Sequence, residues 1–150
     1  MEVSVENILY DCGFTQIKNT KEEIVRLVNE ITRKYNIMNS NYEDIINFLI
    51  KFNNLSVDAS VALRKSMKNY CFHGGFQVSL QYIIDEYEYL FDEYIDIQQR
   101  TNEILFPIGN GFGEILSISD KNKIYISDIS VADNWDEFLN KLVLNMYQNL

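Results

Sequence analysis

The spacing of apolar residues changes along this 150-residue chain, and that change constrains the fold more than any other feature. In the first third of the chain, apolar residues recur every three or four positions, which is the period of one face of an α-helix. After residue 102 they fall in short runs separated by turn residues, which is typical of β-strands. A chain that forms helices first and a sheet later belongs to the α+β class.

The N-terminal third contains three segments with helical period. A short helix is predicted over residues 4–11, and a mostly buried helix over residues 42–52. Between them, Thr20 and Glu23 form a T-x-x-E capping box directly before apolar residues at helical spacing. In such a box the threonine side chain accepts a hydrogen bond from the backbone amide three residues later, which fixes the start of the helix. We therefore expect a helix over residues 20–35.

Strand signals begin near residue 55. Aromatic-rich pieces between residues 55 and 82, broken at Gly74 and Gly75, predict irregular strands. Further along the chain, turn residues separate three more strands, which are expected to pair as a meander: 103–108, 113–119 and 123–129. Asp133 is then expected to cap a closing helix. The chain is thus predicted to form one α+β domain, residues 1–150, with a helix at each end.

The charge of the sequence is unevenly distributed. The net charge is −9, yet residues 1–68 contain nine basic and nine acidic side chains, so residues 69–150 carry the whole excess. A strongly acidic half repels phosphate backbones and anionic lipids, whereas it attracts a basic protein. Direct binding to nucleic acid or to a membrane is therefore disfavoured. Ordinary solubility is the alternative explanation of this charge.

Targeting and cysteine signals are weak in this sequence. The N-terminus lacks the basic region and apolar run of a signal peptide, and no stretch approaches eighteen consecutive apolar residues. We therefore expect a cytoplasmic protein. Cys12 and Cys71 belong to no CxxC pair and have no histidine cluster beside them, so they predict buried thiols and neither a disulfide scaffold nor a zinc site.

Residue patterns that would support catalysis or a cofactor are not found. The single histidine, His73, has no recognisable acid–base partner and is interpreted as a turn residue beside two glycines. The run GNGFG (109–113) lacks the Lys-Ser/Thr of a phosphate-binding loop and precedes a strand, which favours a hairpin connection. Neither a calcium loop nor a Glu-x-x-His motif occurs. The sequence predicts no enzyme, no metal and no cofactor.

The segment YIIDEYEYLFDEYID (82–96) is the most unusual part of the chain. It carries six carboxylates from position 85 to position 96, with no basic residue among them. Its helical period places four of them in a stripe that faces away from the core: Asp85, Glu88, Asp92 and Asp96. Each like-charge pair four residues apart costs a helix about 0.2–0.5 kcal/mol. A packed helix can absorb that cost, so the stripe is either a solvated face or a protein-binding face.

Several segments, taken in order, resemble the SUKH superfamily and, within it, the third bacterial subgroup of immunity proteins. The resemblance rests on a strand with a PIG-type turn, a following hairpin, a C-terminal helix with acidic and aromatic residues near its start, and two N-terminal motifs. In this chain the matching elements are Pro107–Gly109, Leu116–Tyr125, Asp133–Val143, ILYDCGF (8–14) and DIINFLIKFNNLSV (44–57).

This resemblance implies helices packed against a central, mainly antiparallel sheet. It also implies a non-enzymatic immunity protein that blocks a cognate bacterial polymorphic toxin by occlusion. Many such toxins are nucleases with basic surfaces, which the acidic stripe would complement. The alternative is an intracellular scaffold or regulatory protein-interaction domain, and an adjacent toxin gene would distinguish the two. The candidate partner-binding residues are Asp85, Glu88, Tyr89, Asp92, Asp96 and Trp135.

The two aromatic candidates differ in their expected environment. Tyr89 and Trp135 would act as anchors for a partner if their rings are exposed. Trp135 has an alternative interpretation, since it stands near the start of the closing helix and can fold into the core.

Overall fold

The computed structural model describes residues 6–7, 9–10, 14, 17–38, 42–57 and 75–143. Its centre is a six-stranded sheet in the order β1-β2-β3-β4-β5-β6, in which every neighbouring pair is antiparallel. The strands are β1 (Ser56–Val57), β2 (Phe76–Val78), β3 (Leu105–Gly111), β4 (Glu114–Ser119), β5 (Ile124–Ile126) and β6 (Ile129–Ala132). The predicted α+β class and meander are confirmed.

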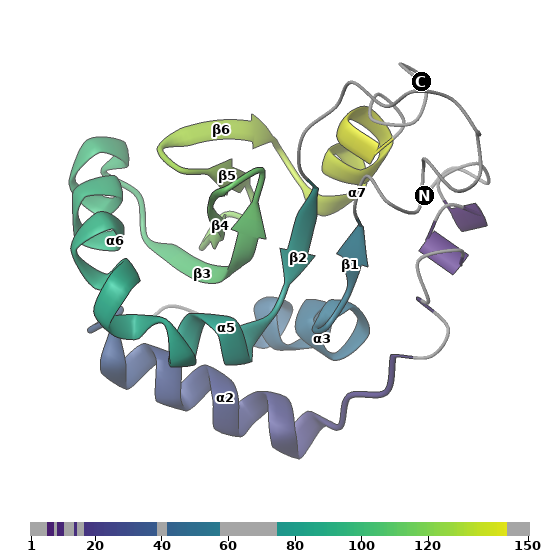
Figure 1. Ribbon diagram of the computed structural model, residues 1–150, viewed down its shortest axis with the longest axis horizontal. Coiled ribbons are helices and arrows are strands. Elements are labelled where there is room, and N and C mark those ends of the chain that lie inside the picture. Colours follow the sequence, from purple (N-terminus) through teal and green to yellow (C-terminus); the bar gives the residue numbers. More distant parts are fainter. Residues whose placement is uncertain are drawn as a thin grey trace.

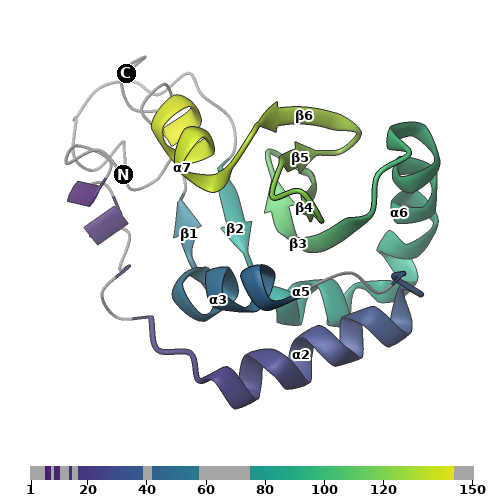
Figure 2. The same cartoon turned by 180° about the vertical axis from the view of Figure 1, so that it is seen from behind.

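Helices surround this sheet at both ends and along one side. They are α2 (Lys21–Lys34), α3 (Glu43–Phe52), α5 (Leu80–Asp85), α6 (Tyr87–Thr101) and α7 (Trp135–Phe138), which continues as a π-helical turn over Leu139–Val143. Figure 1 shows α2 running beneath α3 and α5, with α6 at one end of the molecule and α7 toward the other. The reverse view in Figure 2 gives the same separation of α6 from α7. Among the described residues, no helix has both the length and the apolar composition needed to span a bilayer.

The start of α2 follows the sequence signal. The Thr20 side chain accepts a hydrogen bond from the Glu23 amide at 3.2 Å, which satisfies one of the free donors at the helix N-terminus. The inner face of α2 buries four apolar side chains at helical spacing: Ile24, Leu27, Val28 and Ile31. The predicted helices over 20–35 and 42–52 are therefore confirmed within one residue at each end.

The hairpin between β3 and β4 turns later than the glycines suggested. Gly109 and Gly111 lie inside β3, and the two-residue turn consists of Phe112 and Gly113, with φ of 53° and 86°. Positive φ at both positions matches the right-handed twist of a two-stranded ribbon. Gly109 has a separate role, because a Cβ there would lie 1.9 Å from the carbonyl oxygen of Gln77. Only glycine lets β3 pass this close to β2.

Two predicted elements are divided in the structure. The strand expected over 123–129 is two strands, β5 and β6, because the chain reverses at Ser127 with φ of 55°. The acidic segment, expected as one helix, is α5 followed by α6 with a break at Glu86. The Tyr35 hydroxyl donates to the Ile83 carbonyl oxygen at 2.6 Å. In an unbroken helix, that oxygen would accept from the Tyr87 amide.

The cap of the closing helix is also different from the prediction. Asn134, not Asp133, is the N-cap, and its side chain accepts from the Glu137 amide at 2.9 Å. The Asp133 amide in turn donates to the Glu137 carboxylate at 2.9 Å, so this side chain also satisfies the backbone donor just before the N-cap. This carboxylate also accepts from Lys141, and the two hydrogen bonds, that of Lys141 first, lower the pKa of Glu137.

Some predictions fall outside the described residues. Of the first predicted helix, positions 6, 7, 9 and 10 are helical and Leu9 is fully buried, whereas the rest is not described. The predictions for Cys12, Cys71 and His73 also lie outside the described part of the chain, as does that for Gly74.

Candidate functional site

The first candidate site is the acidic face, which we define as Asp85, Glu88, Tyr89, Asp92 and Asp96. Glu88, Asp92 and Asp96 follow one another at four-residue intervals on α6 and are exposed. The opposite side of α6 buries Leu90, Tyr94 and Ile97. Burial of one side of the helix therefore leaves the carboxylates on the solvent side, as the sequence predicted.

The α6 helix is held against the sheet by a buried hydroxyl group. Tyr94 donates from its hydroxyl to the Leu105 carbonyl oxygen at 2.8 Å, which ties the middle of α6 to the first residue of β3. The Tyr94 ring also meets the Tyr35 ring edge-on, with centroids 5.3 Å apart. Burial raises the pKa of Tyr94, so its hydroxyl remains a proton donor at any physiological pH. The acidic face thus stands on a rigid support.

Among the residues that the structure describes, no cation forms an ion pair with the carboxylates of the acidic face. In the described part of the chain, ion pairs join Arg100 to Asp128 at 3.7 Å and Lys141 to Glu137, and neither involves the acidic face. Asp85, at the end of α5, accepts a hydrogen bond from the neutral amide of Gln81 at 2.9 Å. The nearby Lys34 ammonium lies 5.3 Å from the centre of the Tyr87 ring. The face keeps its negative charge available to an external partner.

Glu93 extends the acidic face toward the sheet. Partial burial raises the pKa of its carboxyl group, and a hydrogen bond and charge repulsion with Glu114 on β4 raise it further. Two carboxyl groups in contact favour the state in which one of them holds a proton. The edge of the face next to β4 is therefore easier to protonate than an isolated glutamate.

The two predicted aromatic anchors lie in opposite environments. Tyr89 projects from α6 with 85% of its surface exposed, the largest exposed fraction among the described large hydrophobic residues. Trp135 is only 8% exposed, and it belongs to α7. Figure 1 places α7 far from α6 along the molecule. The structure therefore exposes Glu88, Tyr89, Asp92 and Asp96 on α6 and Asp85 at the end of α5, where the break at Glu86 interrupts the predicted helical stripe. It separates Trp135 from all of them.

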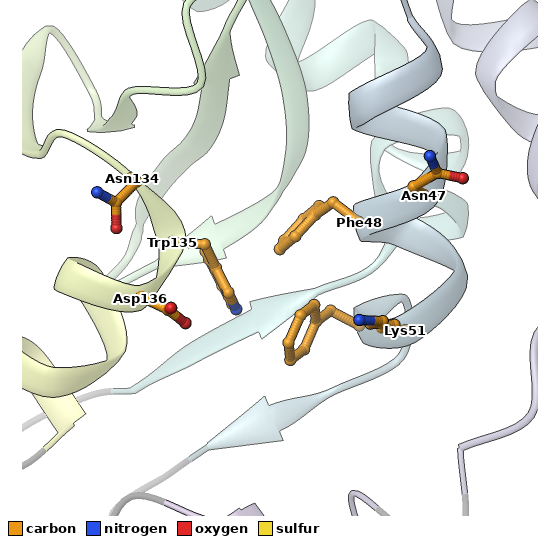
Figure 3. Close-up of a pocket in the computed structure, with 7 residues that line it drawn as sticks. Asn47, Phe48, Lys51, Asn134, Trp135 and Asp136 are labelled. Atoms are coloured by element: carbon orange, nitrogen blue, oxygen red, sulfur yellow. The ribbon is translucent and has the colours of Figure 1, made fainter. Parts of the chain in front are cut away.

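Trp135 instead forms part of a second candidate site, the aromatic pocket between α3 and α7 (Figure 3). This pocket has a volume of ≈ 370 Å³, within the range of small-ligand sites. Its lining residues are Asn47, Phe48, Lys51, Phe52, Asn134, Trp135 and Asp136. Sequence reasoning missed this pocket, because its two halves, residues 47–52 and 134–136, are more than 80 positions apart in the chain.

The walls of the aromatic pocket are packed rings. The Trp135 ring meets Phe48 at a centroid distance of 4.6 Å and Phe52 at 5.3 Å. Behind it, Phe138 stacks on Trp135 at 4.9 Å, and Phe76 of β2 meets it edge-on at 5.9 Å. These contacts fix the indole between the sheet and α3. The hydrogen bond from the Glu137 amide to the Asn134 side chain fixes the start of the helix that carries the indole.

The chemistry of both sites suits binding more than catalysis. Within the described residues, no group of three or more His, Cys, Asp or Glu side chains is placed to hold a metal ion. The acidic face offers charge and one exposed ring, and the aromatic pocket offers apolar walls with a few polar groups at its rim. Neither arrangement contains a nucleophile hydrogen-bonded to a base, which covalent catalysis would require.

Comparison with known protein families gives one match. Residues 1–145 match the family described as SUKH-3 immunity protein. This range includes every element described above, and thus both candidate sites. Searches of curated proteins and of solved structures found no match.

Proposed function

The chain belongs to the SUKH-3 immunity protein family, and from that premise we propose that it neutralises a cognate bacterial toxin by binding it through the acidic face. The bound immunity protein covers the active or substrate-binding site of the toxin and performs no chemistry itself. The toxin that fits best is a basic one, such as a nuclease domain, because its substrate surface carries the charge that complements the carboxylates.

The acidic face supports this proposal through its unpaired charge. Glu88, Asp92 and Asp96 are exposed and have no ion-pair partner in the described structure. A nuclease binds negatively charged phosphate groups, so a row of carboxylates complements the charge of the same basic cleft. Complementary charge also accelerates encounter, with association rate constants up to about 10⁸–10⁹ M⁻¹s⁻¹ at low salt.

Tyr89 adds short-range affinity to this electrostatic attraction. An exposed tyrosine surrounded by acidic residues can bury its ring against the partner and still offer its hydroxyl group to a polar atom. Such aromatic residues commonly dominate the binding free energy of an interface. We therefore place Tyr89 at the centre of the toxin contact, with the carboxylates around it.

The test is a fourfold charge neutralisation, D85N/E88Q/D92N/D96N. Association with the toxin encoded by the adjacent gene is measured by stopped flow across a salt series. We expect the association rate constant at low salt to fall by about 10- to 100-fold, because long-range steering is lost. The slope of the rate against salt concentration should flatten at the same time.

The matched control changes the net charge equally but elsewhere. E6Q/E22Q/D44N/D120N neutralises four exposed carboxylates outside the acidic face. We expect this control to retain most of the association rate. Equal effects of the two variants would mean that only total charge matters, and an unchanged salt slope in the first variant would remove the acidic face from the interface.

A further inference from the structure

The acidic face is too small to hold a toxin by itself. Helix α6 contains 15 residues, so it is about 22 Å long and, with its side chains, about 10 Å wide. A stable protein–protein contact covers about 800 Å² on each partner, which is well beyond what one side of this helix offers. The contact with a toxin must therefore extend from α6 onto a neighbouring surface.

The surface that adjoins the C-terminal end of α6 is the turn between β5 and β6. Arg100 lies four residues after Asp96, one helical turn further along α6. Its guanidinium nitrogen Nη1 is 3.7 Å from a carboxylate oxygen of Asp128 in the turn, and the two side chains are 62% and 35% exposed. Figures 1 and 2 both show this turn at the end of β6 that is nearer to α6. The ion pair therefore joins the acidic face to the turn.

The turn is firmly held by the sheet. It consists of Ser127 and Asp128, between the last residue of β5 and the first residue of β6. Ser127 has a φ of 55°, and its amide donates to the Ile115 carbonyl oxygen of β4 at 2.9 Å. A surface that is fixed before binding loses less conformational entropy in a complex than a mobile loop does. The residue that follows this turn is therefore presented in a fixed place.

That residue, Ile129, is an exposed apolar side chain. It is 63% exposed, and it is one of four exposed large hydrophobic residues in the part of the chain that the structure describes. Single exposed apolar side chains are common on protein surfaces, so its exposure alone would mean little. What distinguishes Ile129 is its place. It follows the residue that pairs with α6, and it begins β6, the last strand of the sheet, where a partner can approach.

We propose that the toxin contact extends from the acidic face onto the turn patch, which we define as Arg100 and Ile129. This inference rests on the proposed function, because the partner is the same toxin. Ile129 packs into an apolar depression of the toxin, and Arg100 donates to a toxin carboxylate. One nitrogen of the guanidinium faces Asp128, but the group has five N–H donors, so others remain available.

The turn patch makes the chemistry of the partner more specific. Along α6 the carboxylates from Glu88 to Asp96 cover about 12 Å, and Arg100 lies about 6 Å further. The matching toxin surface is a basic strip that ends in an acidic group, with an apolar contact beside it. The cation also fixes the direction in which α6 lies on the strip, because the reversed orientation would place Arg100 against a basic group.

Arg100→Gln tests the proposal through the sign of its effect. Removing a cation makes this acidic protein more negative, so long-range attraction to a basic toxin would by itself strengthen binding. We expect instead that the complex dissociates at least about fivefold faster, because a toxin carboxylate loses its partner. Stopped flow with the toxin encoded by the adjacent gene measures both rate constants. Lys21→Gln makes the same charge change at an exposed position on α2, and this control should leave dissociation unchanged.

Asp128→Asn separates direct contact from support of the turn. It removes the ion pair but keeps the Arg100 side chain, and an exposed ion pair contributes little to folding. We therefore expect the dissociation rate constant to change by less than about twofold. An increase as large as that in Arg100→Gln would show that Arg100 only positions the turn, which would overturn its role as a contact.

Ile129→Ala tests the apolar part of the turn patch. Truncation of an apolar anchor should raise the dissociation rate constant about 10-fold. Because no charge changes, the dependence of association on salt should stay as in the wild type. Thermal unfolding should also stay unchanged, since the residue is exposed. Tyr10→Ala, at a 54% exposed position far from α6 in Figure 1, is the control and should bind as the wild type does.

An unchanged dissociation rate constant in either Arg100→Gln or Ile129→Ala would overturn the proposal. The fourfold charge neutralisation distinguishes this failure from a failure of the proposed function. If the fourfold variant loses association rate while the turn-patch variants bind as the wild type does, the acidic face stands and the turn patch falls. If the turn-patch variants dissociate faster while the fourfold variant keeps its rate and salt slope, the proposed function through the acidic face falls and the turn patch is confirmed as a contact.

Discussion

The acidic face and the aromatic pocket are built in opposite ways. The face comes from neighbouring residues on α5 and α6, and its side chains are exposed and charged. The pocket joins α3 to α7, and its walls are rings held against the sheet. Charges on an exposed helix act over a distance of about 8–10 Å at moderate salt, whereas packed rings act only on contact. The acidic face therefore has a long-range electrostatic effect, whereas the aromatic pocket has a short-range packing effect.

This contrast extends to stability. Each carboxylate pair on α6 opposes folding slightly, because like charges repel across one helical turn. The rings of the pocket favour folding strongly, since their burial removes a large apolar area from water. Neutralising carboxylates on α6 should therefore raise the free energy of unfolding, whereas truncating a ring of the aromatic pocket should lower it.

Trp135→Ala should produce the largest loss of stability. The substitution removes contacts with Phe48, Phe52, Phe76 and Phe138, and it leaves a cavity beside the sheet. We expect the free energy of unfolding to fall by about 3–5 kcal/mol, measured by chemical denaturation. Tyr89→Ala, at an 85% exposed position, should change it by less than about 0.5 kcal/mol. Similar losses for both would contradict the contrast between the two sites.

Gly109→Ala should lower the stability of the sheet that lies between α6 and α7. A Cβ at this position would lie 1.9 Å from the Gln77 carbonyl oxygen, so β2 and β3 must move apart. We expect a loss of about 3 kcal/mol in thermal or chemical unfolding. Gly113→Ala is the control: it has open space around the Cβ but a φ of 86°, and should cost only about 1–2 kcal/mol.

Neutralising the acidic face should stabilise the isolated protein. In D85N/E88Q/D92N/D96N, the repulsion between Glu88 and Asp92 and between Asp92 and Asp96 is removed. We expect the free energy of unfolding to rise by about 0.4–1 kcal/mol at low salt, and the gain to shrink at high salt. Denaturation at two salt concentrations measures both values. A loss of stability would show that the hydrogen bond of Asp85 with Gln81 and the position of Glu88 in the first turn of α6 outweigh the repulsion.

Glu93 should give the smallest effect, and one that depends on pH. Its pKa is raised in the folded state, so folding binds a proton more tightly at this carboxyl group. The associated stability is present below the ordinary carboxyl pKa of about 4.3 and is lost as pH rises through the higher folded pKa. Glu93→Gln should therefore be slightly more stable than the wild type at pH 7, by less than about 0.5 kcal/mol, with no gain near pH 4. Unfolding curves at both pH values provide the test.

Local sequence signals predicted some elements well. The start of α2 depends on Thr20 and Glu23, which are three residues apart. The β3–β4 hairpin was predicted as a connection, but its two-residue turn at Phe112 and Gly113 was not. The break at Glu86 could not be predicted in this way. It accompanies a hydrogen bond from Tyr35 to Ile83, two residues 48 positions apart, and no periodicity in the acidic segment records that contact.

The sequence by itself determined the α+β class, the main helices and the exposure of the carboxylates on α6, because periodicity and charge act within a few residues of the chain. Only the tertiary structure decided that Trp135 would be buried against Phe48 and Phe52 and would line a pocket with Lys51. The reason is physical: which apolar groups meet in a core depends on how whole elements pack, and that packing brings together segments whose local sequences carry no information about each other.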